Sequence, residues 1–273
     1  MKVALTGASG FVGTKLQTHF DDVVIIERNE SVTQIVEKLR DVEVVVNLAG
    51  APIIKRWNEA YKSILMQSRI ESTKRVVEAI HQTQVKHFIS TSAIGIYPSD
   101  RRCDEGCTQI ADDFLGDLAQ RWEAEALQCN KPTTILRFGV ILGKEGGALA
   151  KMLPPFQWGV GGVIGDGKMM TSWIDIDDLV GIYDFVIQKK ITGIINAVSP
   201  YPVNNQTFTK ALGNVLHRPT IFPLPTLILR LIYGEASSVL TDSKEVYPRR
   251  LTEEGFVFDY PTIESSLLHQ LTR

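Results

Sequence analysis

A short strand, three glycines and a helix open the chain, and they restrict its fold more than any other stretch. Residues 3–6 are apolar and predict a buried strand. Gly7, Gly10 and Gly13 follow at a spacing of three, and apolar residues at helical spacing come next. Strand, glycine turn and helix begin a nucleotide-binding βαβ unit. We expect Gly7 to form the tight turn, Gly10 to let a pyrophosphate approach the backbone, and Gly13 to let the helix pack closely.

The start of the helix after such a turn is suited to binding a phosphate group. Its first backbone N–H groups lack partners within the helix, and the helix dipole favours negative charge there. The alternative is an ordinary tight turn between a strand and a helix. A second apolar strand at residues 23–26 lies at the distance expected for a dinucleotide-binding unit and favours the phosphate interpretation.

The end of that second strand carries an acid and a base side by side. Glu27 lies 20 positions after Gly7, where such folds place the residue that contacts the adenosine ribose, and Arg28 follows it. An acid there accepts hydrogen bonds from the 2′-hydroxyl and selects NAD, whereas an arginine pairs with a 2′-phosphate and selects NADP. Spacing alone leaves both cofactors open.

Segments that predict strands and helices alternate along most of the remaining chain. Further strands are expected at residues 43–48, 86–91, 133–138 and 194–198. Further helices are expected at residues 32–39, 58–82, 112–128, 175–187, 206–216, 224–233 and 263–271. This alternation predicts an α/β fold with a Rossmann doubly wound parallel sheet.

The segment at residues 143–167 is rich in glycine and interrupts this alternation. Its apolar part, residues 148–158, is expected to start as a helix that Pro154 and Pro155 end early. Residues 159–167 could be taken for a second phosphate loop, but no strand pattern precedes them and no helix pattern follows. We expect an exposed loop or short strands there.

Composition and charge exclude several classes of protein. The chain has 273 residues, 44% of them hydrophobic and 22% charged, which suits one large domain or one with a smaller appendage. The net charge of −2 argues against general nucleic-acid binding. No apolar run approaches the roughly 18 residues of a membrane span. Because the sequence goes directly into a predicted strand, we expect no signal peptide. We expect a cytoplasmic protein that acts on a small-molecule substrate.

The cysteines and histidines do not predict a metal site. Three cysteines, Cys103, Cys107 and Cys129, fit a reducing cytosol better than a disulfide framework. Cys103 and Cys107 could hold a metal only with more ligands, so we interpret them as plain thiols. The five histidines show no metal-ligand spacing.

Small or hydroxyl-bearing residues end two of the predicted strands. Residues 47–50 close one strand with Asn-Leu-Ala-Gly, which leaves room for a ligand in the crevice there. Residues 90–92 end another with Ser-Thr-Ser, a candidate site. The alternative for this second strand end is that its hydroxyls bond the strand end itself.

An ordered set of motifs runs along nearly the whole chain. The set comprises Thr6-Gly7-Ala8-Ser9-Gly10-Phe11-Val12-Gly13, Asn47-Leu48-Ala49-Gly50, Arg56-Trp57-Asn58, Ser68-Arg69 with Thr73, Ser92-Ala93-Ile94-Gly95 with Tyr97, Trp122-Glu123, Arg137-Phe138-Gly139-Val140-Ile141-Leu142-Gly143, Trp173-Ile174-Asp175 with Asp178, and Pro248-Arg249-Arg250-Leu251. With it, the chain resembles the extended short-chain dehydrogenase/reductase superfamily. More closely, it resembles the atypical branch of nucleoside-diphosphate-sugar epimerase-like proteins with a C-terminal domain of unknown function.

The resemblance implies two lobes. An NAD(P)-binding Rossmann domain would comprise residues 1–145 plus about 174–200, and a small α+β substrate-binding lobe about 146–173 plus 201–273. The arginine after the second strand is associated with NADP in this branch, and Arg28 matches it. Glu27 departs from the usual small polar residue. We favour NADP over NAD because a guanidinium suits a phosphate.

The same resemblance implies a set of cofactor-binding residues. These are Gly7, Ser9, Gly10, Phe11, Val12, Gly13, Arg28, Leu48, Ala49, Gly50, Arg69, Ser90, Thr91, Arg137, Gly139 and Val140. For Arg137, binding of a substrate phosphate and pairing with a carboxylate inside the sheet edge both stay open.

The catalytic pair of the wider superfamily is missing. Its enzymes use Tyr-x-x-x-Lys on the helix expected here at residues 112–128, which contains no tyrosine. We predict Tyr97 as a substitute acid/base and Ser92 as the hydroxyl that orients the substrate. The alternative for Tyr97 is a surface aromatic residue that packs on the C-terminal lobe.

The resemblance implies an NADP-dependent oxidoreductase or epimerase that transfers hydride at nicotinamide C4. The substrate stays open, with a nucleotide sugar as a candidate. A non-catalytic NADP-binding sensor or regulatory protein is the alternative, kept open by the missing pair. The chain is expected to be a monomer or a homodimer through the helices at residues 58–82 and 112–128, without nucleic-acid or membrane partners.

Overall fold

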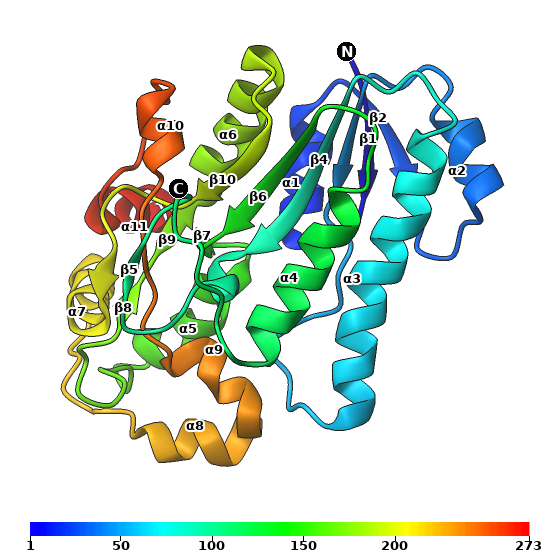
Figure 1. Ribbon diagram of the computed structural model, residues 1–273. Helices are drawn as coiled ribbons and strands as arrows, with labels where there is room; N and C mark the ends of the chain where they lie inside the picture. The colour runs from blue at the N-terminus through cyan, green and yellow to red at the C-terminus, as the bar shows by residue number, and fades with distance from the viewer. Residues whose placement is uncertain (273) are drawn as a thin grey trace.

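The computed structural model describes residues 1–272, whose centre is a six-stranded parallel sheet with helices on both faces (Figure 1). The spatial order of the strands is β2-β1-β3-β4-β6-β10. In chain order they are β1 (Lys2–Thr6), β2 (Asp22–Ile26), β3 (Val44–Asn47), β4 (His87–Ala93), β6 (Thr133–Phe138) and β10 (Gly193–Ala197). The predicted Rossmann doubly wound sheet is confirmed, and each strand begins and ends within two residues of its predicted position.

Helices and three short strand pairs complete the structure. The helices are α1 (Phe11–His19), α2 (Val32–Lys38), α3 (Glu59–Ile80), α4 (Phe114–Ala126), α5 (Gly147–Gln157), α6 (Ile176–Lys189), α7 (Asn205–Leu216), α8 (Thr226–Tyr233), α9 (Ser238–Thr241), α10 (Arg249–Glu253) and α11 (Ile263–Thr272). The pairs are β5 (Arg102–Cys103) with β12 (Glu245–Val246), β7 (Val140–Gly143) with β9 (Trp173–Asp175), and β8 (Met170–Thr171) with β11 (Val203–Asn204).

Side chains alternate across the sheet and build a core on each face. Val3 and Leu5 of β1 face a cluster that includes residues of α1 and α6, whereas Ala4 faces a cluster that includes residues of α2, α3 and α4. Both faces of the parallel sheet are therefore covered, which explains why strands such as β1 and β3 are apolar along most of their length.

A third core lies outside the sheet. It joins α5, α7 and α11 to β7 and β9, with Trp173, Phe208 and Leu267 fully or almost fully buried. Figure 1 shows α5, α7 and α8 gathered beyond the carboxyl ends of the sheet strands. These elements outside the sheet face the carboxyl ends of its strands, where ligands of such folds bind.

Helix α5 differs from its predicted course, because Pro154 and Pro155 lie inside it and do not end it. Each proline removes one backbone N–H donor from the last turns of the helix. Leu153 and Phe156 are buried in the third core. Burial of these side chains favours continuation of the helix, and the expectation of an early end was wrong.

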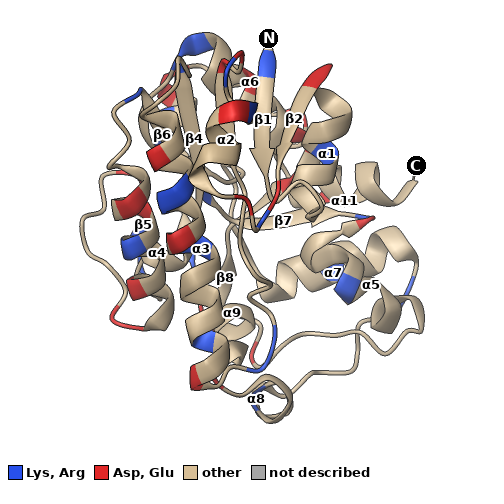
Figure 2. Ribbon diagram, turned by 90° about the vertical axis from the view of Figure 1, so that its right-hand side faces the viewer, with Lys and Arg blue, Asp and Glu red and all other residues tan. Residues whose placement is uncertain are grey.

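The helices carry charged residues of both signs. Figure 2 shows basic and acidic residues interspersed along α3. No helix within residues 1–272 combines the length and the apolar character needed to cross a bilayer.

Candidate functional site

The order of the sheet reverses between β1 and β3, and this point lies at the glycine turn. From β1 the chain moves outward to β2, and from β3 it moves the other way through β4, β6 and β10. Ligands of open parallel sheets bind beyond the carboxyl ends of the strands at such a reversal. The turn at residues 7–10 and the segment after β3, residues 48–50, both lie there.

The glycines of the turn are required by close backbone approach. Gly7 has φ +64°, and a Cβ on it would lie 2.8 Å from the carbonyl carbon of Leu48. A Cβ on Gly13 would lie 2.4 Å from the carbonyl oxygen of Gly7, so α1 could not pack as it does. A Cβ on Gly10 would meet only the Gly7 carbonyl oxygen, at 3.2 Å. Gly10 therefore leaves the approach to the backbone open.

The first turn of α1 carries neither a cap nor a competing charge. Gly10 is the N-cap residue and supplies no side-chain cap, no side chain within residues 1–272 is bonded to the first N–H groups, and this turn contains no acid. Ser9 is exposed beside it, whereas the Val12 side chain is buried, so only the backbone of Val12 can face a ligand. An uncapped helix N-terminus of this kind binds anions.

The ring of Phe11 occupies the space that side chains would need at three later glycine positions. Cβ atoms on Gly143, Gly146 or Gly147 would lie 2.4, 2.3 and 3.1 Å from its ring. The ring thus packs under the loop between β7 and α5 and holds the start of α1 against it.

Thr6 and Asn47 hold the two strand ends together. The Thr6 hydroxyl donates to Asn47 Oδ1 at 2.7 Å and accepts from the backbone N–H groups of Leu48 and Ala49 at 3.0 and 3.1 Å. Asn47 Nδ2 donates to Thr73 Oγ1 of α3 at 2.8 Å. This buried network fixes the backbone of residues 48–50 opposite the glycine turn. The sequence motifs contain these residues but did not reveal this role, because it depends on contacts between separate elements.

Two arginines lie close together at the end of β2. Arg75 Nη2 of α3 donates to the carbonyl oxygen of Arg28 at 2.9 Å, and Glu27 and Arg28 are exposed. Within residues 1–272, neither arginine forms an ion pair. Arg75 was missed by sequence reasoning, because 47 positions separate it from Arg28.

Arg69 is a third cation at the site. Its guanidinium donates to the Ala51 carbonyl oxygen at 3.0 Å and lies over the Trp122 ring, with 5.3 Å between its central carbon and the ring centroid. A Cβ on Gly50 would lie 3.0 Å from that carbon. Burial lowers the pKa of Arg69 to about 10, and no acid pairs with it in the part of the chain that the structure describes. A partly buried guanidinium without an acid is suited to an anion.

Ser92, Tyr97 and Arg137 share one buried network at the ends of β4 and β6. Ser92 Oγ donates to Glu123 Oε1 at 2.6 Å, and Arg137 donates to both oxygens of Glu123 at 2.7 Å. Arg137 also donates to the Tyr97 hydroxyl at 2.7 Å, and that hydroxyl donates to Asn196 Oδ1 at 2.9 Å. Of the two alternatives left open for Arg137, the structure has the pairing with a carboxylate.

These side chains are closed to solvent. Ser92 and Tyr97 are each 1% exposed and Arg137 is 6% exposed. Burial raises the pKa of Tyr97 to about 12, although Arg137 beside it acts in the opposite direction. Tyr97 therefore keeps its proton at neutral pH. Glu123 accepts from both Ser92 and Arg137, a role that its place in the Trp122-Glu123 motif did not reveal.

The remaining predicted contacts lie deeper in the sheet. Ser90 Oγ accepts from Asn47 Nδ2 at 3.2 Å, and Thr91 is buried. The N–H groups of Gly139 and Val140 donate to the carbonyl oxygens of Ala197 and Ser172 at 3.2 and 2.9 Å. Ser90 and the two amides are thus engaged within the protein, unlike the start of α1.

One group of side chains has metal-ligand character. Oxygens of Asp175 and Asp177 and a nitrogen of His269 lie within 4.8 Å of one another, although the sequence spacing of the histidines gave no such signal. Each is already bonded: Asp175 accepts from Ser266 at 2.6 Å, and Asp177 contacts His269 at 2.7 Å. The cluster joins α6 to α11.

Comparison with known families covers most of the chain. A sequence model of the NAD dependent epimerase/dehydratase family matches residues 3–197, and a domain of unknown function, DUF1731, matches residues 224–270. Epimerase family protein SDR39U1 of Mus musculus is 32% identical and covers 98% of each chain. The chloroplastic SDR39U1 homolog of Arabidopsis thaliana is 33% identical over 98% of this chain and 86% of its own length.

Solved structures agree with these relatives. Human epimerase family protein SDR39U1, isoform 2, crystallised with NADPH, matches with a TM-score of 0.94 and 29% identity over 100% of both chains. A nucleoside-diphosphate sugar epimerase from Corynebacterium glutamicum matches with a TM-score of 0.77 and 31% identity over 99% of this chain and 58% of its own.

Proposed function

Because the chain belongs to the NAD dependent epimerase/dehydratase family, we propose that it binds NADP at the glycine turn. One observation carries the proposal: an uncapped helix N-terminus at the reversal of the sheet, with two unpaired arginines at the end of the neighbouring strand. The similar human protein was crystallised with NADPH, which supports the phosphorylated cofactor.

Each part of the cofactor has a group in this chain that suits it. The N–H groups at the start of α1 would hold the pyrophosphate. Arg28 and Arg75 would pair with the 2′-phosphate, and Glu27 would turn away from it. Residues 48–50, fixed by Thr6 and Asn47, would line the other side of the crevice, with Arg69 behind them.

We propose further that the protein is an oxidoreductase or epimerase that acts on a small substrate, with a nucleotide sugar as the candidate class. The nicotinamide would supply hydride transfer at C4 when bound. Residues 146–173 plus 201–273 would form the substrate lobe, and residues 1–145 plus 174–200 the cofactor domain. The similarity to a nucleoside-diphosphate sugar epimerase supports the substrate class.

The buried network favours a second candidate function. The two hydroxyls predicted to act on the substrate, Ser92 and Tyr97, are bonded to Glu123 and Asn196 and closed to solvent. In this arrangement they hold β4 and β6 to α4 and β10. A non-catalytic NADP sensor needs no exposed acid/base, so this function is the alternative.

The first experiment titrates the purified protein with NADPH and NADH and follows nicotinamide fluorescence. Arg28→Ala should weaken NADPH binding by about 10- to 100-fold, because one charge-assisted contact to a phosphate contributes about 1.5–3 kcal/mol. NADH binding should change by less than about twofold, because NADH has no 2′-phosphate. Arg75→Ala should act in the same direction.

Arg121→Ala is the matched control, because it removes an exposed arginine from α4 away from the glycine turn. A preference of the wild type for NADH would mean that Glu27 governs the pocket and would overturn the choice of NADP. Failure to bind either cofactor would overturn the proposed function.

Turnover separates the two candidates. The NADP-loaded and NADPH-loaded proteins are offered a library of nucleotide sugars, and cofactor oxidation state and sugar epimers are measured. An enzyme converts at least one substrate, and Tyr97→Phe then slows that conversion if Tyr97 is the acid/base. A sensor binds both cofactor forms with different affinities and converts nothing.

A further inference from the structure

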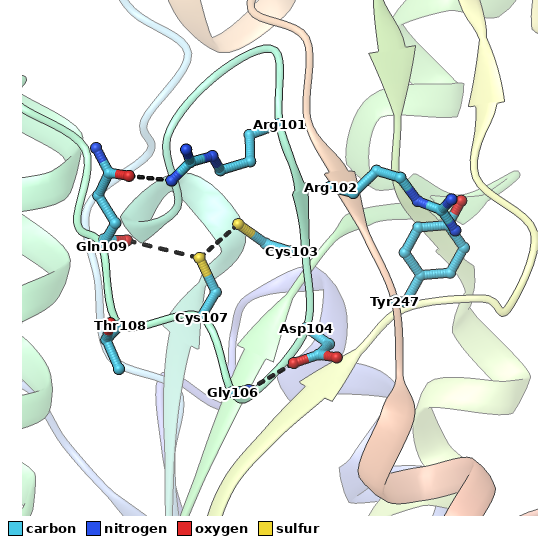
Figure 3. A pocket seen from close by; sticks show the side chains of 9 residues that line it. All are labelled: Arg101, Arg102, Cys103, Asp104, Gly106, Cys107, Thr108, Gln109 and Tyr247. Carbon is cyan, nitrogen blue, oxygen red and sulfur yellow. Dashed lines mark hydrogen bonds between the residues drawn. The ribbon is translucent and has the colours of Figure 1, made fainter.

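Two cysteines that the proposed function does not use lie in contact in a surface turn. Cys103 ends β5, and Cys107 follows four residues later. Their sulfur atoms are 2.7 Å apart, and both residues are free cysteines (Figure 3). The sequence interpretation of two separate plain thiols did not anticipate that the turn brings them together.

The turn holds the two sulfurs in place. The backbone N–H of Gly106 donates to Asp104 Oδ1 at 2.6 Å, which closes the turn between the cysteines. On one side, the Cys103 carbonyl oxygen accepts from the Tyr247 N–H at 2.9 Å, in line with the pairing of β5 with β12. On the other side, Arg101 donates to Gln109 across the loop. Little reorganisation is therefore needed to join the two thiols.

The two thiols differ in access. Cys103 is 4% exposed, whereas Cys107 is partly exposed at an open cavity of about 680 Å³. Arg101 and Asp104 also line this cavity, so charges of both signs lie near its thiols, whereas Arg102 is directed toward Tyr247 (Figure 3). Burial, together with Cys107, raises the pKa of Cys103 to about 12. A reagent from solution therefore meets Cys107 first.

The turn between the cysteines contacts the junction of the two lobes. Glu105 Oε1 accepts from the Asn196 N–H of β10 at 2.9 Å, and Glu105 Oε2 accepts from the Arg250 N–H of α10 at 3.3 Å. Asn196 also accepts from Tyr97, so this turn and the buried network share a residue. A covalent bond across the turn would fix Glu105 between the sheet and the C-terminal segment.

We propose that Cys103 and Cys107 form a reversible dithiol–disulfide pair, oxidised by a low-molecular-weight disulfide that enters the open cavity at Cys107. The Cys107 thiolate attacks one sulfur of that disulfide, forms a mixed disulfide and releases one small thiolate. Cys103 then loses its proton, attacks Cys107 Sγ and expels the second small thiolate. The two cysteines lose two electrons, the small disulfide gains them, and the two cysteine protons end on the released thiols.

The test incubates the folded full-length protein with oxidised glutathione and then measures intact mass and free thiols. The wild type should lose the mass of two hydrogens and keep one free thiol, and peptide mapping should join Cys103 to Cys107. Dithiothreitol should restore both thiols. Cys129→Ser, the matched control, should form the same bond and keep no free thiol.

Single variants test the order of attack. Cys103→Ser, and Cys103→Ala if the serine variant does not fold, should stop at a glutathione adduct on Cys107. Cys107→Ser should take up at least tenfold less glutathione than Cys103→Ser in the same time, because Cys103 is buried. A stable wild-type adduct without an internal bond, a bond to Cys129, or three unchanged thiols would each overturn the proposal.

Discussion

Glu123 is the residue on which the buried network at the ends of β4 and β6 depends. It accepts two hydrogen bonds from Arg137 and one from Ser92, and the Glu123 and Arg137 side chains are each 7% exposed. A buried ion pair of this kind contributes little net stability as a whole, but removal of one partner leaves an unpaired buried charge.

Glu123→Gln should therefore lower the free energy of unfolding by about 3 kcal/mol or more, because the Arg137 guanidinium loses its counter-charge. Urea unfolding followed by circular dichroism measures this change. Asp117→Asn, on the same helix, breaks an exposed pair with Arg121 and should cost less than about 1 kcal/mol. Equal costs for the two variants would mean that the Glu123 pair is not desolvated as described.

The residue scale also explains which parts of the site could be predicted from the sequence. Gly7, Gly10 and Gly13 form a local pattern, and Arg28 follows a recognisable strand. The contact of Arg75 with Arg28 could not be predicted, because it depends on how α3 packs beside β2. Likewise, Ser92 is bonded to Glu123 of α4 and Tyr97 to Asn196 of β10, so the two hydroxyls could be located but their partners could not.

At the scale of elements, the close packing of α1 against the glycine turn sets the position of the proposed phosphate site. The carbonyl oxygen of Gly7 and the backbone of Ala8 occupy the space that a Cβ on Gly13 would need. The helix can approach the turn this closely only at a glycine.

Gly13→Ala should lower the free energy of unfolding by about 1–3 kcal/mol and weaken NADPH binding, because α1 must move away from the turn. Thermal unfolding and the fluorescence titration measure the two effects. Gly181→Ala in α6 is the control, because a Cβ there would meet only Phe256, at 3.6 Å. Replacement of this helical glycine by alanine should raise the free energy of unfolding by up to about 1 kcal/mol. Similar destabilisation in both variants would contradict the packing argument.

The sequence predicted some elements better than others, and the reasons are physical. Most of the six sheet strands are rich in apolar residues because both faces are covered, so their pattern is strong, whereas β4 also buries Ser90, Thr91 and Ser92. Strands of two residues, such as β5 and β12, carry no periodicity, and their pairing joins segments far apart in the chain. Helix α5 was misjudged because the free energy of burying Phe156 and Leu153 is not visible in local preferences.

At the scale of the whole molecule, Asp178 ties α6 to the C-terminal segment. It lies in the first turn of α6 and accepts from the backbone N–H groups of Asp259 and Tyr260 at 2.8 and 3.1 Å. Burial raises the pKa of this carboxyl to about 6, more than the two hydrogen bonds lower it. The C-terminal segment is thus held to the sheet through a group that titrates.

A raised pKa means that the folded chain holds this proton more tightly than the unfolded chain, whose aspartates titrate near 3.9. The stability from Asp178 is present below about pH 4 and is lost as the pH rises through about 6. Relative to Asp178→Asn, the wild type should lose up to about 3 kcal/mol of unfolding free energy between pH 4 and pH 7. Urea unfolding of both proteins across this range measures it. A difference in unfolding free energy between the two proteins that does not change with pH would contradict the raised pKa of Asp178.

The strand order has a consequence for synthesis on the ribosome. Strands β2-β1-β3-β4 are contiguous both in the sheet and within the first 93 residues, and the glycine turn, Arg28, Arg69 and Arg75 all lie in that stretch. Chains fold from the N-terminus as they emerge. A nascent chain therefore presents the groups that we propose bind NADP before β6, β10 and the C-terminal helices have been translated. A dinucleotide that binds at this stage would act as a template for these four strands.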